Sequence, residues 1–275
     1  MCIRDSYNVV QAYMALGGIP FYMNFFNPSL SLAQNIDALF FARNAKLADE
    51  FNRLFNSVFD HAEESMQIVR VLGGRHAGYS RREIAEKTGI NPNGEFTKML
   101  KALIGSDFVC KYVPFGASSK EERYKLTDPF CWFWLHFKES KRVSQEDYWQ
   151  HHLRESEVAA WRGVAFEEVC LRHVKQIKQA LQIGAVSSTE SAYVTKGDEK
   201  TEGMQIDLVI DRNDDVVNLC EIKFSKSPYV ISQAYASRLA TRQETLEKSV
   251  RNKTFMLTYI GNSPLAENEL SLIHI

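Results

Sequence analysis

The sequence predicts an α+β chain that is divided into several domains, and three observations lead to this fold class. Residues 7–60 carry apolar side chains at helical spacing, interrupted by glycine and proline. Residues 61–128 have the pattern of short helices followed by a hairpin. Residues 156–264 have the pattern helix, strand, strand, helix, strand, abbreviated αββαβ, and residues 129–155 before them predict an aromatic linker helix.

The composition narrows the class of protein. The chain is 45% hydrophobic, which predicts a globular protein. Its net charge of −1 does not by itself indicate a nucleic-acid partner. It lacks a run of about twenty apolar residues, which predicts a soluble, cytoplasmic protein with no membrane span. The cysteines lack CxxC spacing, which argues for reduced thiols in the core and against zinc or disulfides. Apart from Cys2, which lies in the first six residues, they are Cys110, Cys131, Cys170 and Cys220.

The two ends of the chain have related coding sequences. Residues 1–6 can be encoded by a DNA whose reverse complement encodes residues 270–275. This relation is typical of adaptor DNA at both ends of a library insert and is similar to a transposase mosaic end. We therefore treat 1–6 and 270–275 as adaptor-derived and expect the natural protein to extend beyond both.

Residues 7–60 predict short helices, broken at Gly17-Gly18-Ile19-Pro20 and at Asn27-Pro28. The segment is small and apolar for its length. We expect it to be part of a larger helical unit.

Residues 61–128 have the pattern of a winged helix-turn-helix. Helices are expected at 65–72, at 81–88 with Ser80 and Glu83 as a capping box, and at 93–104. The third helix should bury its apolar side chains and leave Glu95, Thr97, Lys98 and Lys101 outward. Strands at 108–114 and 123–126 would form the wing hairpin. The expected buried residues are Phe96, Met99, Leu100 and Leu103.

This region is basic within a nearly neutral chain, because residues 65–125 hold 11 Lys and Arg against 6 Asp and Glu. Such a balance is compatible with binding to duplex DNA. It is also compatible with a winged helix that only connects domains. The candidate DNA-binding residues are Arg81, Arg82, Lys98, Lys101, Lys111 and Lys125.

Aromatic residues are concentrated between 130 and 149. They could stack on nucleic-acid bases, but a packed linker helix is the preferred interpretation. The residues are Phe130, Trp132, Phe133, Trp134, Phe137 and Trp149.

Residues 157–183 predict one long amphipathic helix. Its apolar stripe runs through Phe166, Cys170, Val174, Ile177 and Leu181, with Glu167 at the edge and Glu168 on the opposite side. Glu167 is therefore the acid expected to reach over a sheet edge. The alternative is a surface position with no function.

Two alternating strands, 204–210 and 216–224, are joined by a turn at 212–215. Folding this hairpin about its midpoint, Asp214, places Asp207 opposite Glu221, with Lys223 on the same face and Ile222 pointing into the core. The Cβ atoms of Asp207 and Glu221 would then lie about 5 Å apart. A helix at 232–249 and a strand at 254–260 complete the αββαβ order.

Opposed carboxylates are destabilising unless a cation lies between them. The carboxylates of Asp207 and Glu221, the main-chain carbonyl of Ile222 and waters suit Mg²⁺ or Mn²⁺ rather than zinc. Lys223 beside such an ion could orient or deprotonate an attacking water and offset charge on a phosphorane-like transition state. The alternative is that the acids are ordinary residues of an exposed sheet face.

This arrangement of Glu167, Asp207 and Glu221-Ile222-Lys223 resembles the PD-(D/E)XK nuclease superfamily, which includes restriction and Holliday-junction-resolving enzymes. The resemblance implies a restriction-endonuclease-like domain in which Asp207 and Glu221 bind the metal and Lys223 assists the water. Glu167 would support this catalytic group from the first helix. The sequence departs from many members in having Ile206 where they carry proline.

A narrower resemblance covers nearly all of residues 7–261. It rests on GGIPFYM, SLAQNIDALFF, REIAEKTGI, FEEVC and GMQIDLVIDR followed by NLCEIKFS. These segments look like the C-terminal part of bacterial and archaeal AAA-type ATPases that carry a PD-(D/E)XK-like domain. The resemblance implies that 7–60 belongs to the ATPase lid, that ATP binds only to a missing N-terminal domain, and that this domain could form homo-oligomers.

The residues leave three functions open. The chain could be a Mg²⁺- or Mn²⁺-dependent DNA endonuclease joined to an ATPase. It could be a non-catalytic regulatory or protein-interaction module with a nuclease-like fold. It could also bind DNA through the winged helix without cleaving it.

Overall fold

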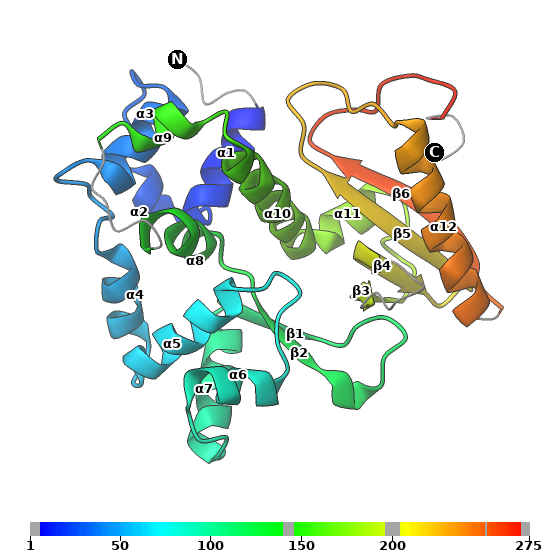
Figure 1. Ribbon diagram of the computed structural model, residues 1–275, viewed down its shortest axis with the longest axis horizontal. Coiled ribbons are helices and arrows are strands. Elements are labelled where there is room, and N and C mark those ends of the chain that lie inside the picture. Colours follow the sequence, from blue (N-terminus) through cyan, green and yellow to red (C-terminus); the bar gives the residue numbers. More distant parts are fainter. Residues whose placement is uncertain (1–5, 140–145, 196–203, 251, 271–275) are drawn as a thin grey trace. The chain divides into compact units, whose positions relative to one another are not determined.

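The computed structural model describes residues 6–139, 146–195, 204–250 and 252–270 (Figure 1). Of the stretches predicted to be adaptor-derived, 1–6 and 270–275, all but Ser6 and Leu270 lie outside the described residues. The chain has a mixed α+β fold, as predicted, and forms two compact units. The first contains the chain up to Lys111 together with Glu122–Glu168, and the second contains Tyr112–Glu121 together with the chain from Val169 onward.

The first unit begins with short helices, broken where the sequence predicts. Gly17 and Gly18 have φ angles of 69° and 71°, a conformation that favours glycine, and they end the first helix. Pro20 opens the next helix, and Ser31 caps the third with Gln34 as its capping-box partner. These elements are α1 (Ser6–Leu16), α2 (Pro20–Met23), α3 (Leu32–Ile36), the π-helix η1 (Asp37–Phe41) and α4 (Glu50–Val58).

Residues 62–126 form the expected helices and hairpin. The elements are α5 (Ala62–Gly73), α6 (Arg81–Thr88), α7 (Gly94–Gly105), β1 (Val109–Tyr112), the 3₁₀ turn η2 (Ser119–Glu121) and β2 (Arg123–Leu126). The capping box of Ser80 and Glu83 is present, and Asn93 caps α7. The predicted apolar face of α7 is buried, whereas Thr97, expected to face outward, is half-buried.

The aromatic side chains between 130 and 149 form much of the core of the first unit. They lie on α8 (Pro129–Phe133), the π-helix η3 (Trp134–Glu139) and α9 (Tyr148–His152), which replace the predicted single linker helix. All six predicted aromatics are buried. Phe133, for example, contacts Phe40, Trp149 and Trp161 with ring centroids 4.6–5.4 Å apart. Burial removes these rings from any contact with nucleic-acid bases, so the stacking interpretation is wrong.

The long helix predicted at 157–183 is two helices, α10 (Ser156–Arg172) and α11 (Val174–Ala180). The break is at His173, whose backbone leaves helical geometry (φ −115°, ψ 25°). Its ring nitrogen Nδ1 lies 2.7 Å from the carbonyl oxygen of Val169. The apolar period continues through this break, so the periodicity alone did not indicate it.

The second unit contains a sheet with the strand order β3-β4-β5-β6. The strands are β3 (Ser188–Thr195), β4 (Met204–Arg212), β5 (Val216–Lys223) and β6 (Thr254–Gly261), and α12 (Gln233–Ser249) precedes β6. β3, β4 and β5 are antiparallel neighbours, and β6 is parallel to β5. The αββαβ prediction therefore missed β3. This strand is rich in Ser and Thr, so it lacks the apolar alternation by which the other strands were found.

A compact apolar cluster supports this sheet. Buried side chains of β4, β5 and β6 meet Leu246 of α12, which packs this helix against the sheet. The cluster contains Met204, Ile206, Val209, Val217, Leu219, Leu246 and Phe255.

The tip of the β1–β2 hairpin, Tyr112–Glu121, belongs to the second unit. The backbone N–H of Phe115 donates to the carbonyl oxygen of Ala192, at 2.9 Å. Ala192 lies where the register of β3 shifts, and the ring of Phe115 packs against the apolar cluster and Tyr193. The hairpin tip thus covers an edge strand instead of projecting as a free wing.

Candidate functional site

The β4–β5 hairpin has the register predicted from the sequence. Leu208 pairs with Cys220 and Asp211 with Val217. Continued by one residue, this register places Asp207 opposite Glu221. The turn occurs at Asn213–Asp215, where Asp215 has a φ of 61° and the Asp214 carboxylate pairs with Arg212. Local turn chemistry and strand alternation together therefore bring the candidate acids to the same end of the hairpin.

The Asp207 carboxylate contacts the backbone of the neighbouring strand. Its Oδ2 accepts a hydrogen bond from the N–H of Ile222, at 3.2 Å. The side chain of Ile222 is buried, as predicted. Its main chain therefore faces the acids while its side chain holds β5 in the core.

Glu221 accepts hydrogen bonds at both of its oxygens. Oε1 accepts from Lys223 Nζ at 2.8 Å and from the hydroxyl of Tyr235. Oε2 accepts from Arg242 Nη1 at 3.1 Å. The side chain of Glu221 is 12% exposed, and those of Lys223 and Arg242 are 26% and 25% exposed. The carboxylate is thus held by cations that remain open to water.

Lys223 joins two of the predicted metal ligands. Besides Glu221, its Nζ donates to the main-chain oxygen of Ile222, at 3.1 Å. Nζ also lies 5.5 Å from the centroid of the Tyr235 ring, a favourable distance for a cation over an aromatic face. One ammonium nitrogen therefore marks the point on which the oxygens of Glu221 and Ile222 converge.

Tyr235, Arg238 and Arg242 extend the site from α12, and the sequence did not identify them. Ser232 caps this helix by accepting from the N–H of Tyr235. Spacings of three and four residues place the three side chains on one helix face. The Arg238 guanidinium carbon lies 5.4 Å from the centroid of the Tyr235 ring. The helical spacing was visible in the sequence, but not that this face turns toward Glu221.

The environment fixes the protonation of two neighbouring groups. Burial, followed by the negative charge of Glu221, raises the pKa of Tyr235 far above its usual value. Tyr235 is thus a permanent hydrogen-bond donor at neutral pH. Burial, followed by the charge of Asp207, raises the pKa of the Cys220 thiol to about 12. Cys220 consequently stays a thiol and is a poor nucleophile.

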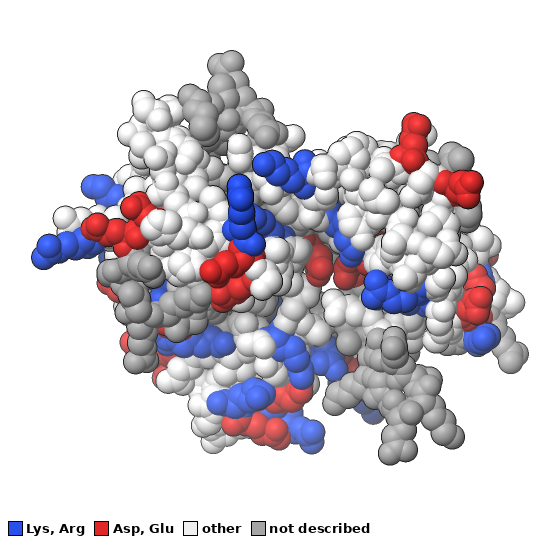
Figure 2. All heavy atoms as spheres, turned by 45° about the horizontal axis from the view of Figure 1, so that its top comes forward, with Lys and Arg blue, Asp and Glu red and all other residues white. Residues whose placement is uncertain are grey.

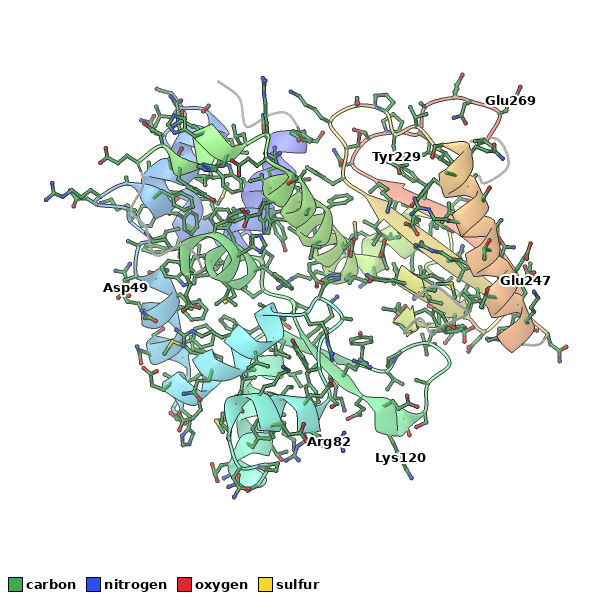
Figure 3. The ribbon with its side chains drawn as sticks, in the orientation of Figure 1. Asp49, Arg82, Lys120, Tyr229, Glu247 and Glu269 are labelled. Atoms are coloured by element: carbon green, nitrogen blue, oxygen red, sulfur yellow. The ribbon has the colours of Figure 1, made fainter. Side chains whose placement is uncertain are left out.

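The cavity beside Glu221 is small. Its volume is about 20 Å³, and its lining includes Glu221, Tyr235, Leu239 and Tyr259. This space is enough for about one water molecule. Tyr229, on the loop between β5 and α12 (Figure 3), lies near this group, with its ring centroid 6.0 Å from those of Tyr235 and Tyr259. A ligand larger than water would have to contact the site from its open side.

The chemistry of the oxygens fits a hard divalent cation. Asp207, Glu221 and the carbonyl of Ile222 are the ligand types that Mg²⁺ and Mn²⁺ prefer. The contacts of Lys223 show that two of them converge on a position already suited to a positive charge. In the described part of the chain, no three His, Cys, Asp or Glu side chains are grouped as metal ligands. Any ion held here would therefore keep several waters.

Glu167, the predicted supporting acid, belongs to the first unit. Its Oε2 lies 3.5 Å from Nδ1 of His76. Asp207, Glu221 and Lys223 belong to the second unit. A role for Glu167 at the candidate site stays a prediction.

Glu168 and Lys125 form a buried ion pair that the sequence did not indicate. Glu168 Oε1 lies 2.5 Å from Lys125 Nζ and 2.6 Å from Nε2 of His76. Burial alone would raise the pKa of Glu168, but the charge of Lys125 and the contact with His76 hold it below its usual value. Lys125 is buried, so it cannot contact a DNA phosphate. Its assignment as a DNA-binding residue is wrong.

The other candidate DNA-binding residues form internal contacts to different degrees. Arg81 donates to the carbonyl oxygens of Pro92 and Asn93 and so ties α6 to the start of α7. Arg82, Lys98 and Lys111 are each close to an acid, namely Glu86, Glu95 and Glu122. Lys101 is exposed on α7.

These pairs offset much of the local positive charge. The face drawn in Figure 2 shows basic and acidic side chains interspersed and not gathered into one basic area. Lys98 and Lys101 are both exposed on α7, although Lys98 is paired with Glu95.

Two further findings concern the chain as a whole. None of the described helices is long and apolar enough to cross a membrane. No protein-family model matches the chain, and no curated protein is significantly similar to it in sequence.

Proposed function

We propose that the second unit is a Mg²⁺- or Mn²⁺-dependent DNA endonuclease module. One observation carries this proposal: the hairpin register brings the Asp207 carboxylate to the N–H of Ile222, next to Glu221 and Lys223. Asp207, Glu221 and the carbonyl of Ile222 would hold the ion. When bound, such an ion supplies an acidic water and offsets charge on the phosphate.

The chain's own residues would prepare the site for this chemistry. Tyr235 and Arg242 hold the Glu221 carboxylate from α12, which fixes the direction of its oxygens. Lys223 supplies a positive charge that is partly open to solvent and could approach a phosphodiester or its attacking water. Glu167 would support these groups, as the resemblance to the PD-(D/E)XK superfamily implies.

Cleavage by the full chain tests the proposal. With Mg²⁺ or Mn²⁺ we expect cleavage of duplex, branched or single-stranded DNA, and loss of at least about a hundredfold in rate in Glu221→Ala and in Lys223→Ala. Lys226→Ala removes an exposed lysine close in sequence and serves as the matched control. If the folded chain cleaves none of these DNAs with either metal, the catalytic proposal is wrong.

A non-catalytic interaction module is the second candidate, and the internal donors that contact both oxygens of Glu221 favour it. The small cavity beside Glu221 favours it too. Unfolding temperature separates the two candidates, because ligand that binds only the folded state stabilises it by mass action. An unchanged unfolding temperature in millimolar Mn²⁺ would support the non-catalytic module.

We also propose that residues 62–126 contact duplex DNA through α7, as exposed Lys98 and Lys101 allow. The docked hairpin tip supports the alternative, in which this region only connects domains. For the parent protein we propose a cytoplasmic AAA-type ATPase whose ATP site precedes this chain. A phosphate-binding GxxxxGK[ST] motif in the upstream reading frame is the observation that tests this relationship.

A further inference from the structure

The contacts of Lys223 point to a regulatory role in the candidate site, and this inference rests on the proposed function. The Nζ atom contacts Glu221 Oε1 and the Ile222 carbonyl oxygen, at 2.8 and 3.1 Å. These are two of the oxygens expected to bind the divalent ion. An ammonium group and a metal ion compete for the same converging oxygens, because both are cations and repel each other.

The remaining contacts of Glu221 leave little room for both cations. The hydroxyl of Tyr235 takes one acceptor position of Oε1, and Arg242 takes one acceptor position of Oε2. A carboxylate oxygen accepts about two hydrogen bonds. With Lys223 and Tyr235 both bonded to Oε1, that oxygen has no lone pair directed at a metal ion. Departure of Lys223 restores one, and it frees the Ile222 carbonyl at the same time.

Lys223 can leave at low cost. Its side chain is 26% exposed, so water can solvate the ammonium group as soon as it moves away. A partly exposed ion pair of this kind contributes little to stability, because water replaces its contacts. The buried Lys125–Glu168 pair lacks this freedom, because its side chains are only 7% and 1% exposed.

We propose that Lys223 is an exchangeable internal cation: it neutralises Glu221 in the metal-free protein and is released when a divalent ion binds. Release makes the ammonium available to an anionic group of the substrate only while the ion is present. Lys223 can therefore contact a phosphodiester only when the metal ion is bound. Binding of DNA phosphate to the released ammonium should in turn raise metal affinity, because coupling between two binding sites is reciprocal.

Mn²⁺ affinity gives the first test, measured on the full chain by counting free Mn²⁺ with electron paramagnetic resonance. We expect Lys223→Met to bind Mn²⁺ at least about fivefold more tightly than the unaltered protein, because no ammonium has to be displaced. Asp207→Asn in the same background should abolish this gain. Equal or weaker binding by a folded Lys223→Met variant would overturn the exchange.

Removal of any nearby positive charge also strengthens binding of a metal cation, so a matched control is needed. Arg238→Met removes a cation beside the Tyr235 ring, and Lys226→Met removes an exposed lysine three residues from Lys223. We expect less than about a twofold gain from either change, because exposed charges are strongly screened. A gain in Arg238→Met as large as that in Lys223→Met would reduce the effect to general electrostatics and overturn the proposal.

Chemical labelling measures the release itself in the unaltered protein. Lysines held in ion pairs react slowly with acetic anhydride, so labelling of Lys223 relative to Lys226 should rise several-fold when Mn²⁺ is added. Unchanged relative labelling at saturating Mn²⁺ would contradict the exchange. Cleavage of DNA is scored separately: a protein that cleaves DNA but shows no release of Lys223 loses this inference and keeps the proposed function.

Discussion

The two units each contain a Glu–Lys pair, and the pairs differ in their access to water. Glu168 and Lys125 in the first unit are almost fully buried, with His76 as a further neighbour. Glu221 and Lys223 in the second unit are partly exposed, and Glu221 also accepts hydrogen bonds from Tyr235 and Arg242. The same chemical pair should therefore behave differently in the two units. A buried lysine is not easily replaced by another cation, whereas a partly exposed lysine is.

The buried pair should show the largest effect on stability. Lys125→Met leaves the Glu168 carboxylate buried without its ammonium partner, which costs about 3–5 kcal/mol. Urea unfolding followed by tryptophan fluorescence measures this loss in the first unit, since the chain's four tryptophans all lie there. Lys125→Met combined with Glu168→Gln should recover much of it. A loss below about 1 kcal/mol in the single variant would remove the contrast between the pairs.

Acid should have the second-largest effect on stability, because it protonates Glu168 of the buried pair. The pKa of Glu168 is lowered from its ordinary value of 4.5, so its contribution is present above that pH and is lost as the pH falls through the lowered value. Below pH 4.5, unfolding free energy should therefore fall more steeply in the unaltered protein than in Glu168→Gln, by up to about 1.4 kcal/mol per pH unit. Parallel pH profiles of the two proteins would contradict this assignment.

The exposed pair should matter little for stability. Lys223→Met removes an ion pair that water can replace, so the free energy of unfolding should change by about 1 kcal/mol or less. Calorimetry of the full chain measures this effect. A loss above about 2 kcal/mol would mean that Lys223 is a structural residue like Lys125, and the comparison between the pairs would fail.

Lysines that are exposed on α7 should leave stability unchanged and act only on DNA binding. Changing Lys98 and Lys101 together to alanine should lower the salt dependence of duplex binding by about two units of slope, since each phosphate contact contributes about 0.9. Fluorescence anisotropy at several salt concentrations checks this. An unchanged slope would favour the interpretation of this region as a connector between domains.

The candidate hairpin was predictable because its signals are local. Alternation fixes which side chains of β4 and β5 face the core, and the turn at Asn213–Asp215 fixes the register. Asp207 opposite Glu221 follows from these features alone. The contacts of Tyr235 and Arg242 do not follow from them, because these contacts depend on how α12 is oriented and packed on the sheet through Leu246.

Lys125 shows why burial is harder to predict than secondary structure. Between Tyr124 and Leu126, it reads as the outward residue of an alternating strand. In the structure, Gly78 approaches this strand so closely that a Cβ there would lie 2.9 Å from the Cβ of Lys125. Glu168, distant in sequence, supplies the opposite charge. Both partners come from other elements, so strand periodicity carried no sign of them.

The docked hairpin tip also bears on the order in which the chain folds. Phe115 packs against the apolar cluster of the second unit, although the 47 residues Glu122–Glu168 of the first unit separate the hairpin tip from the rest of the second. Contacts between distant segments form slowly, because a long loop must close first. A fragment cut at residue 156 would lack this tip and expose the β3 edge to other chains. The hairpin tip is thus synthesised before the sheet that it covers, and it can dock only once that sheet has formed.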